Sequence, residues 1–490
     1  MKKILVANRG EIAVRVMRTC KKLGIKTVAV YSEIDSKSLH ALYADEAYCI
    51  GDNAPSKSYL DMDKIIEVAL RSGADGIHPG YGFLSENSQF CKAVKDAGLI
   101  FIGPDEHAID VMGNKLAAKE AVRHYNIPMV PGSGKAITDV QDAIRMAEEI
   151  GYPVLIKAAA GGGGKGMRVV EDSPSFIESF ERATNEALSS FKDGSVFIEK
   201  YVTKPRHIEI QIIADQFGNI CYLFERECSI QRRHQKVIEE APSAIVSSAM
   251  RKAMGEAAVN VARACNYTNA GTVEFLVDEK LNFYFLEMNT RLQVEHPVTE
   301  EISGLDMVEL QISIALGKSL PFSQDDLKIH GHSMELRVYA EDPYNQFLPD
   351  IGTLQVYQEP TGEHIRVDSG FKAGDAVSVF YDPMISKLTV WGLDRASCIA
   401  KMKAAINEYE IIGVKTTLPF GLFVMNHEAF ASGNFDTSFV PKYFTTDIMD
   451  QEDDNNAMIA ALISNQLHLS NGKEDYVLKN RRSRWMARKQ

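Results

Sequence analysis

Residues 1–110 alternate short apolar runs with segments of helical periodicity, and this repetition constrains the fold more than any other feature. The runs KILVA at 3–7 and KTVAVYS at 26–32 are typical of buried strands, and an amphipathic segment at 11–24 separates them. Strand–helix–strand repetition predicts a parallel sheet with helices on its faces. The sequence NRGE at 8–11 has one glycine where a dinucleotide-binding fingerprint has three. We therefore expect a Rossmann-like domain without that fingerprint.

The rest of the chain changes its pattern near residues 112 and 325. Between these points a glycine-rich segment, strands of period two and long amphipathic helices predict a domain of mixed helices and strands. From about residue 330, short strand-like runs with one late helix predict a mostly antiparallel β domain. We expect an α/β fold, α+β over the whole chain, with domains at 1–112, 113–325 and 326–446 and a charged tail at 447–490.

Composition limits the classes of function that the chain supports. With 490 residues it is too long for one hydrophobic core, and its 45% apolar and 24% charged residues are ordinary for a globular protein. The net charge of −12 argues against nucleic acid or an anionic membrane as the main partner. Seven scattered cysteines without a C-x-x-C pair, and the lack of an apolar leader or membrane-spanning run, predict reduced thiols in a cytoplasmic protein.

The segment KAAAGGGGKG at 157–166 suggests a loop that approaches phosphate, although it fits neither common phosphate-binding pattern. A P-loop needs a hydroxyl after its lysine to ligate Mg²⁺, but Gly166 follows Lys165 and Ala159 stands where the first glycine belongs. The pattern G-x-G-x-x-G is met by any run of glycines and carries little weight. The kind of loop therefore has to be inferred from other parts of the chain.

Two carboxylates lie among apolar neighbours in the segment 271–300, which predicts a β-hairpin. If the hairpin turns at 280–281, Glu274 and Glu287 lie directly opposite each other, and Asn289 shares the face of Glu287. Two apposed carboxylates repel unless a proton or cation lies between them. Two carboxylates and an amide oxygen suit Mg²⁺, whereas two solvent-facing glutamates on a half-exposed sheet are the alternative, and the hairpin alone favours neither.

Further polar residues favour a site over a surface strand. Arg291, Gln293 and Glu295 extend the alternation past Asn289, which would place polar groups along one face of the strand. Basic residues also occur where phosphate ligands are expected, close to the glycines, near a helix start and in one dense cluster. These are Lys157, Lys115, and the cluster Arg232, Arg233, His234 and Lys236.

Seven segments together resemble the biotin carboxylase family of ATP-grasp enzymes. They are ILVANRGEIAVR, GIHPGYGFLSEN, FIGP, KAAAGGGGKGMRVV, RHIEIQ, SIQRRHQKVIEEAP and EMNTRLQVEHPVTE. The resemblance runs in order from residue 3 to about residue 445. It implies an N-terminal biotin carboxylase domain, an ATP-grasp domain with a lid subdomain at about 131–203, and a biotin carboxylase C-terminal domain. It also implies that the glycine run is the mobile lid loop, where glycine lets backbone amides approach phosphate.

The resemblance implies a nucleotide and metal site. ATP would lie between the lid and the central domain, with Mg²⁺, or Mn²⁺ as an alternative, held by Glu274, Glu287 and Asn289. Lys115 and Lys157 would contact the phosphates, and Gly163 and Gly164 would lie in the lid loop. The adenine hinge would be Glu199, Lys200, Tyr201 and Val202, and further nucleotide contacts would come from His207, Gln231, His234 and Leu276.

The resemblance also implies the chemistry. Bicarbonate attacks the γ-phosphate of ATP to give carboxyphosphate, and biotin is then carboxylated. Glu295 would be the general base, and Lys236, Arg291, Gln293 and the amide of Val294 would bind bicarbonate. Because arginine pairs with a planar oxyanion through two nitrogens, Arg291→Lys should not be conservative. Arg337, in MELRVYAEDP, matches the arginine that stabilises the biotin enolate.

Biotin is expected as a substrate on another protein. Lys403 in IAKMKAA is similar to the biotin-attachment signature, but Ala404 follows it and the segment is helical in pattern, whereas an attachment lysine needs an exposed hairpin tip. The expected partners are a biotin carboxyl carrier protein and a carboxyltransferase subunit, and the chain itself is expected to be a homodimer. The expected context is the first half-reaction of an acetyl-CoA or other acyl-CoA carboxylase in fatty acid or related metabolism.

Two alternative functions and two departures from the family pattern remain. A different ATP-grasp ligase is disfavoured by RLQVEHPVTE and Arg337. A regulatory nucleotide-binding subunit would lack a metal carboxylate or the base, yet all the matching positions are present. Ala159 stands where many relatives have serine, with little effect expected because the backbone makes the contact. The tail at 447–490 exceeds a minimal domain and is expected to dock a partner subunit.

Overall fold

The computed structural model describes residues 1–158, 167–191 and 193–445 of the chain. It divides into two units, residues 1–440 and residues 441–490, and the elements that form the site lie in the first unit. The expected lid residues Gly163 and Gly164 and the expected tail at 447–490 fall outside the described residues.

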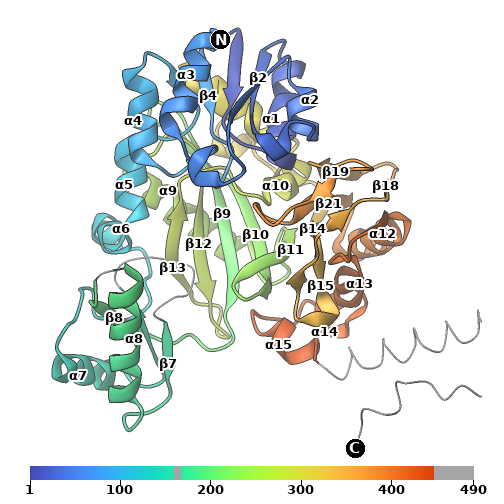
Figure 1. The fold of residues 1–490 in the computed structure, drawn as a ribbon. Helices are drawn as coiled ribbons and strands as arrows, with labels where there is room; N and C mark the ends of the chain where they lie inside the picture. Colours follow the sequence, from blue (N-terminus) through green and yellow to red (C-terminus); the bar gives the residue numbers. More distant parts are fainter. Residues whose placement is uncertain (159–166, 192, 446–490) are drawn as a thin grey trace, which may run out of the picture. The chain divides into compact units, whose positions relative to one another are not determined.

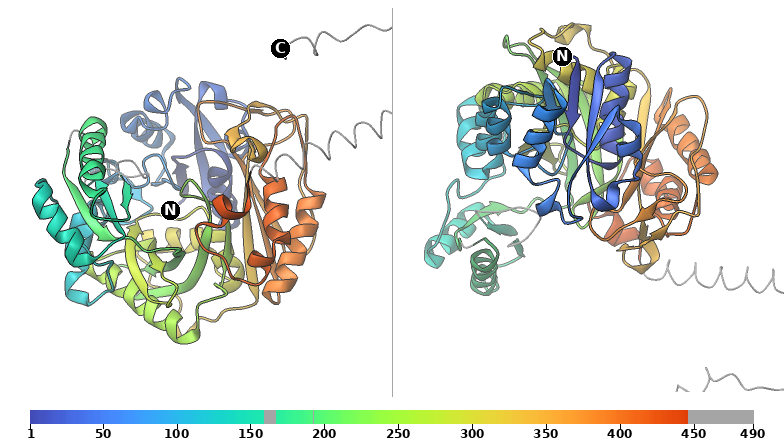
Figure 2. Two further views of the ribbon diagram at one scale, coloured as in Figure 1. Left: turned by 90° about the horizontal axis from the view of Figure 1, so that it is seen from below. Right: turned by 45° about the horizontal axis from the view of Figure 1, so that its top comes forward.

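The N-terminal part is a five-stranded parallel sheet in the order β3-β2-β1-β4-β5. Alternate residues of β1 point to opposite faces, so Ile4 and Val6 pack with α1 and Leu5 packs with α3 and α4. Helices therefore lie on both sides of the sheet (Figure 2, right), which confirms the predicted fold of this part. Its elements are β1 (Lys3–Val6), α1 (Gly10–Lys22), β2 (Lys26–Ser32), η1 (Glu33–Asp35), α2 (Leu39–Tyr43), β3 (Glu46–Gly51), η2 (Pro55–Lys57), α3 (Met62–Ser72), β4 (Gly76–His78), α4 (Ser88–Asp96), β5 (Ile100–Phe101) and α5 (Glu106–Gly113).

A small module follows, formed by a three-stranded antiparallel sheet in the order β7-β6-β8 (teal in Figure 1). Its own apolar core joins Ile156 and Ile198 of the sheet to Phe176 and Phe180 of α8. The strands on either side of the glycine-rich segment, and the helix and strand that follow, fit the predicted mixture of helices and strands. The elements of this stretch are α6 (Lys115–Val122), η3 (Arg123–Tyr125), α7 (Val140–Ile150), β6 (Val154–Ala158), β7 (Arg168–Val170), α8 (Phe176–Phe191) and β8 (Val196–Lys200). Helix α6 lies outside the module, because Ala118 and Val122 pack in the core of the central part.

The largest sheet has eight antiparallel strands in the order β13-β12-β9-β10-β11-β14-β21-β19. It runs across residue 325, the expected domain limit, because β11 pairs with β14 (Figure 1, green to orange). Every residue of β9 is buried, although four of its nine side chains are polar or charged. The strands and helices of the central part are β9 (Arg206–Ala214), β10 (Ile220–Arg232), β11 (Gln235–Ala241), α9 (Ser248–Ala264), β12 (Asn269–Val277), β13 (Phe283–Asn289), α10 (His296–Ser303), α11 (Met307–Ala315) and η4 (Gln324–Asp326).

The C-terminal part adds three strands, β14, β21 and β19, to that sheet and several short strand pairs around them. Lys403 lies on α12, as its helical pattern predicts, and is half-buried. None of the described helices is long and apolar enough to cross a membrane. The elements are β14 (His332–Tyr339), β15 (Glu341–Asp342), η5 (Pro343–Asn345), β16 (Leu348–Pro349), β17 (Gly352–Thr353), β18 (Val356–Gln358), β19 (Ile365–Ser369), β20 (Ala376–Val377), β21 (Met384–Gly392), α12 (Arg395–Glu408), β22 (Glu410–Ile412), α13 (Leu418–Asn426), α14 (Glu428–Ala431) and α15 (Phe439–Tyr443).

Candidate active site

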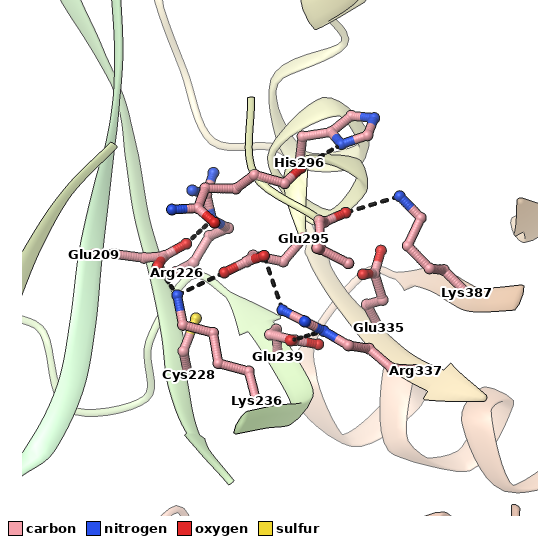
Figure 3. Close-up of polar contacts among 12 residues, drawn as sticks. Glu209, Arg226, Cys228, Lys236, Glu239, Glu295, His296, Glu335, Arg337 and Lys387 are labelled. Carbon is pink, nitrogen blue, oxygen red and sulfur yellow. Dashed lines mark hydrogen bonds and ion pairs between the residues drawn. The ribbon is translucent and has the colours of Figure 1, made fainter. Parts of the chain in front are cut away.

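A buried network of carboxylates and cations lies on the eight-stranded sheet (Figure 3). Its centre is Lys236 on β11, whose Nζ donates to Glu274 Oε1 at 2.8 Å, to Glu295 Oε1 at 2.7 Å and to Glu209. Burial lowers the pKa of Lys236, but the three carboxylates outweigh it and hold that pKa well above its ordinary value. Lys236 is therefore a fixed cation that draws three acids from three different elements together.

Glu295 lies between two cations. Its Oε2 accepts from Arg337 Nη2 at 2.9 Å, opposite the contact with Lys236, and its side chain is fully buried. Burial raises the pKa of Glu295, but Lys236, Arg337 and Arg226 together lower it well below the ordinary value. Glu295 is thus ionised at neutral pH and able to accept a proton.

The expected strand alternation from Asn289 to Glu295 is wrong. Strand β13 ends at Asn289, and Glu295 is the N-cap residue of α10. Pro297 explains the change, because a proline in the first turn of a helix has its φ preset and lacks only an N–H that would be unpaired there. The helix start therefore places the Glu295 carboxylate, whereas the sequence pattern predicts a strand position.

The three expected metal ligands lie on one hairpin. The register pairs Glu274 with Glu287, as predicted, with an irregularity between Glu274 and Phe275. Glu274 Oε1 accepts from Asn289 Nδ2 at 2.9 Å, and its Oε2 lies 3.1 Å from His207 Nε2. Burial raises the pKa of Glu274, but Lys236 and His207 lower it strongly, so the group is a carboxylate. Two opposed carboxylates with a neighbouring amide oxygen fit a hard cation such as Mg²⁺.

Expected nucleotide contacts on β6 and β8 converge on one carboxylate. Glu199 accepts from Lys157 Nζ at 2.7 Å and also from Lys119, a residue that the sequence analysis missed. Burial raises the pKa of Glu199, but the two lysines lower it below its ordinary value. Lys157 and Glu199 therefore lie together, as a phosphate ligand and an adenine ligand of one nucleotide site would.

Two of the other expected hinge residues make contacts with the loop before β6. Lys200 Nζ donates to the carbonyl oxygens of Gly151 and Tyr152, both at 2.8 Å, and the amide of Tyr201 donates to Pro153 O at 3.0 Å. Lys200 and Tyr201 thus tie the expected adenine hinge to the loop before β6, and Val202 beside them is half-buried.

The structure separates the basic cluster that the sequence predicted. His234 is exposed in the turn between β10 and β11, at a φ of +67°. Gln231 is buried, and its Nε2 donates to Cys228 O at 2.7 Å. Leu276 pairs with His207 across β12 and β9. Helix α6 begins at Lys115, whose side chain falls outside the described part.

Three of the expected bicarbonate and biotin ligands, Arg291, Val294 and Arg337, line a cleft of about 610 Å³, whereas Lys236 and Gln293 are not among its lining residues. Arg291 Nε donates to Glu86 at 2.8 Å and its Nη1 donates to Gln293 Oε1 at 2.9 Å. The buried Nε2 of Gln293 has no hydrogen-bond partner among the described residues. A buried amide donor of this kind is suited to an oxygen-bearing ligand, because leaving it unpaired costs free energy.

Five buried or cleft-lining residues of the network were missed by the sequence analysis. Lys387 on β21 is fully buried and donates to Val294 O at 2.8 Å, which fixes the backbone just before Glu295. The period-two pattern of ISKLTVWG places a lysine among apolar residues, and this was the available signal. The others are Glu86, Glu209, Arg226 and Glu239.

Three family descriptions match almost the whole described chain. Residues 1–109 match the biotin carboxylase N-terminal domain, residues 114–323 the carbamoyl-phosphate synthase L chain ATP-binding domain, and residues 335–442 the biotin carboxylase C-terminal domain.

Three curated relatives are about half identical to the chain. A pyruvate carboxylase subunit of Methanothermobacter thermautotrophicus is 52% identical over 441 residues, covering 90% of each chain. Biotin carboxylase of Halalkalibacterium halodurans is 50% identical over 442 residues, covering 90% of this chain and 98% of that one. The human mitochondrial propionyl-CoA carboxylase alpha chain is 52% identical over 440 residues, and the match covers 89% of this chain but only 60% of that longer one.

Two solved structures are similar over 90% of this chain at 47% identity. One is a biotin carboxylase–β-γ-ATP complex from Campylobacter jejuni, with a TM-score of 0.87 and 99% of that chain covered. The other is the biotin carboxylase domain dimer of Hydrogenobacter thermophilus 2-oxoglutarate carboxylase with MgADP, ADP and bicarbonate, with a TM-score of 0.86 and 97% of that chain covered.

Proposed function

The chain belongs to the biotin carboxylase family, and on this premise we propose that it carboxylates biotin on a separate carrier protein, using ATP and bicarbonate. It is a carboxylating enzyme of the ligase class. The observation that carries the proposal is the ionised Glu295, held between Lys236 and Arg337 beside a cleft that Arg291 and Val294 also line.

ATP and Mg²⁺ are the cofactors of this reaction. Bound Mg²⁺ would neutralise phosphate charge and so ease attack at the γ-phosphate. Glu274, Glu287 and Asn289 would hold it through oxygen atoms. Lys157 is paired with Glu199 in this structure, at 2.7 Å, and would turn toward the more highly charged phosphates when the nucleotide binds.

Glu295 would take the proton of bicarbonate. In the structure both of its oxygens are stabilised by cations, which makes it a weak base. A bicarbonate anion at the cleft would compete for Lys236 and Arg337, so Glu295 would lose part of that stabilisation and its affinity for a proton would rise. Arg291 and the amide of Gln293 would fix the anion by charge and by hydrogen bonding.

Arg337 would act in the second step. It lines the cleft, and its guanidinium is held on one side by Glu295 and on the other by Glu239. A fixed cation there would stabilise the negative charge that develops on the biotin ureido oxygen when N1′ loses its proton. Transfer of the CO2 unit from carboxyphosphate to N1′ releases phosphate, and that phosphate would take the N1′ proton, because Glu295 already holds the proton of bicarbonate.

We place the enzyme in a larger carboxylase with a carrier protein and a carboxyltransferase, acting as a homodimer in the cytoplasm. The dimer of the Hydrogenobacter relative supports the oligomeric state, and the seven free cysteines support a reducing compartment. We assign the final acceptor to the acyl-CoA class, in fatty acid or related metabolism. Similar identity to the Methanothermobacter pyruvate carboxylase protein supports a 2-oxo acid as the second candidate.

The test is bicarbonate-dependent release of ADP by the purified chain with Mg²⁺ and ATP, with and without free biotin. Biotin-stimulated turnover that is lost in Glu295→Ala and in Arg337→Ala would support both proposed roles. Bicarbonate-dependent turnover without any response to biotin would retain carboxyphosphate formation and remove the proposed role of Arg337. Turnover that does not depend on bicarbonate would refute the proposal.

A further inference from the structure

Behind Arg337 lies a second carboxylate pair that the reaction described above does not use. Glu239 on β11 and Glu335 on β14 are directly opposite each other in the register of the sheet, and both side chains are fully buried. Residues directly opposite on antiparallel strands have Cβ atoms about 5 Å apart, so their side chains are neighbours. Figure 3 shows both carboxyl groups next to the Arg337 side chain.

Two ionised carboxylates in that position would repel strongly, because burial removes them from the bulk solvent that weakens such repulsion at a surface. Arg337 Nε donates to Glu239 Oε1 at 2.6 Å, whereas Glu335 accepts only a neutral hydroxyl, from Thr389 at 3.0 Å, among the described residues. Burial raises the pKa of Glu239 as well, to about 7, but the pKa of Glu335 rises further, so Glu239 is the member that ionises first and the proton of the pair belongs on Glu335. Burial is the main cause that raises the pKa of Glu335 well above its ordinary value, with Glu239 adding to it.

The two unpaired oxygens of the pair support this assignment. Glu239 Oε2 and Glu335 Oε1 are buried and have no hydrogen-bond partner among the described residues. An unpaired buried acceptor is costly, and two ionised carboxylates on paired residues offer no donor to each other. One proton on Glu335 supplies the missing donor and lowers the charge of the pair to a single negative charge, which Arg337 balances.

Glu239 also controls how Arg337 meets the general base. Arg337 Nε donates a hydrogen bond to Glu239, and Arg337 Nη2 donates one to Glu295 at 2.9 Å. Without the Glu239 carboxylate, the same edge of the guanidinium would be free to pair with both oxygens of Glu295. That arrangement would turn Arg337 away from the cleft and further stabilise the anionic form of the base.

We propose that Glu239 is a positioning residue for the carboxylation of biotin, which holds Arg337 at the cleft, and that Glu335 is its protonated partner. This inference rests on the function proposed above, and it concerns residues that touch neither substrate nor metal in that scheme. Lys387, Lys236 and Glu295 are the other charged groups that act on the pair.

The experiment compares Glu239→Gln, Glu335→Gln and the exposed control Glu363→Gln with the wild type. Two rates are measured, the biotin-stimulated release of ADP and the slower bicarbonate-dependent release without biotin. We expect Glu239→Gln to lower kcat/KM for biotin by about 10- to 100-fold, the value of one charge-assisted hydrogen bond, while the rate without biotin falls far less. Glu335→Gln should lower kcat/KM for biotin by less than about threefold, because an amide is isosteric with the neutral acid.

A double-mutant cycle tests whether Glu239 acts through Arg337. In an Arg337→Gln background, Glu239→Gln should lower kcat/KM for biotin by less than about twofold further. If the two residues acted independently, Glu239→Gln would lower it by the same factor as in the wild type. Glu239→Asp keeps the charge one methylene further away and should give a partial loss, which keeps the test open if Glu239→Gln does not fold.

The outcomes separate this inference from the function beneath it. A wild-type enzyme that does not respond to biotin overturns the proposed function and the inference with it. A wild-type response together with an unchanged Glu239→Gln enzyme overturns the inference alone. Equal large losses in Glu239→Gln and Glu335→Gln overturn the placement of the proton, and equal losses with and without biotin show a merely structural role.

Discussion

Glu11 should make the folded enzyme less stable as the pH rises through neutrality. The side chain is 4% exposed, at the start of α1, and neither oxygen accepts a hydrogen bond from the described residues. Lys387 Nζ, at 3.4 Å, is the cation paired with it. Burial outweighs Lys387 and raises the pKa of Glu11 from 4.5 to about 7.

The magnitude follows from linkage. The folded state binds the Glu11 proton more tightly than the unfolded state, so the stability from this group is complete at low pH and is lost as the pH rises through about 7. At about 1.4 kcal/mol per pKa unit, the loss between about pH 5.5 and about pH 8.5 is about 2 kcal/mol.

The assay is urea unfolding of the wild type and Glu11→Gln at those two pH values. Glutamine cannot ionise. From the lower to the higher pH, the free energy of unfolding of the wild type should therefore fall by about 2 kcal/mol more than that of the variant. Taking this difference cancels any effect of the amide on packing that does not depend on pH. Glu33→Gln, at an exposed position, is the control and should follow the wild type. If Glu11→Gln showed the full wild-type pH dependence, the argument from burial would be refuted.

Three further predictions concern the site. Arg291→Lys keeps the charge but not the planar fork, so the KM for bicarbonate in the ADP-release assay should rise at least about tenfold, and an unchanged KM would contradict the assigned role. Glu274→Gln and Glu287→Gln should each raise the Mg²⁺ concentration for half-maximal activity at least about tenfold; an unaltered Mg²⁺ requirement would exclude these ligands. Arg226→Met leaves a buried carboxylate and three further acceptors without their donor, so the free energy of unfolding should fall by about 3–5 kcal/mol, against little change in the exposed control Arg263→Met.

The elements predicted best from sequence are those set by local pattern. The parallel N-terminal sheet follows from apolar runs that alternate with amphipathic helices, and each run fits one strand. The pairing of Glu274 with Glu287 was predicted from a turn at 280–281. The actual loop is longer, closed by Asp278 N to Asn282 O at 2.9 Å, and the irregularity beside Glu274 restores the predicted pairing. Local pattern therefore gave the correct neighbours although the turn differs.

The parts that sequence did not predict depend on contacts between distant segments. Strand β11 pairs with β14 across the expected domain limit, and only that pairing places Glu239 opposite Glu335 and next to Arg337. Period-two alternation identifies which residues share a face of one strand, but it does not identify the neighbouring strand. Glu209 and Lys387 were missed for the same reason, since each is an isolated charge in an apolar run until its partner strand is known.

Each cation of the network is shared by at least two acceptors, and this explains why the site should respond to mutation as a unit. Lys236 joins three carboxylates, and Arg337 joins Glu239 to Glu295. Removing one carboxylate frees a cation to move closer to the remaining acids, which lowers their pKa instead of leaving it unchanged. Losses at Glu239 and Arg337 should therefore overlap, whereas Arg291, which pairs with Glu86 and Gln293, should combine with them almost independently. The charge arrangement thus predicts which pairs of substitutions are additive, a property that neither strand register nor family membership determines.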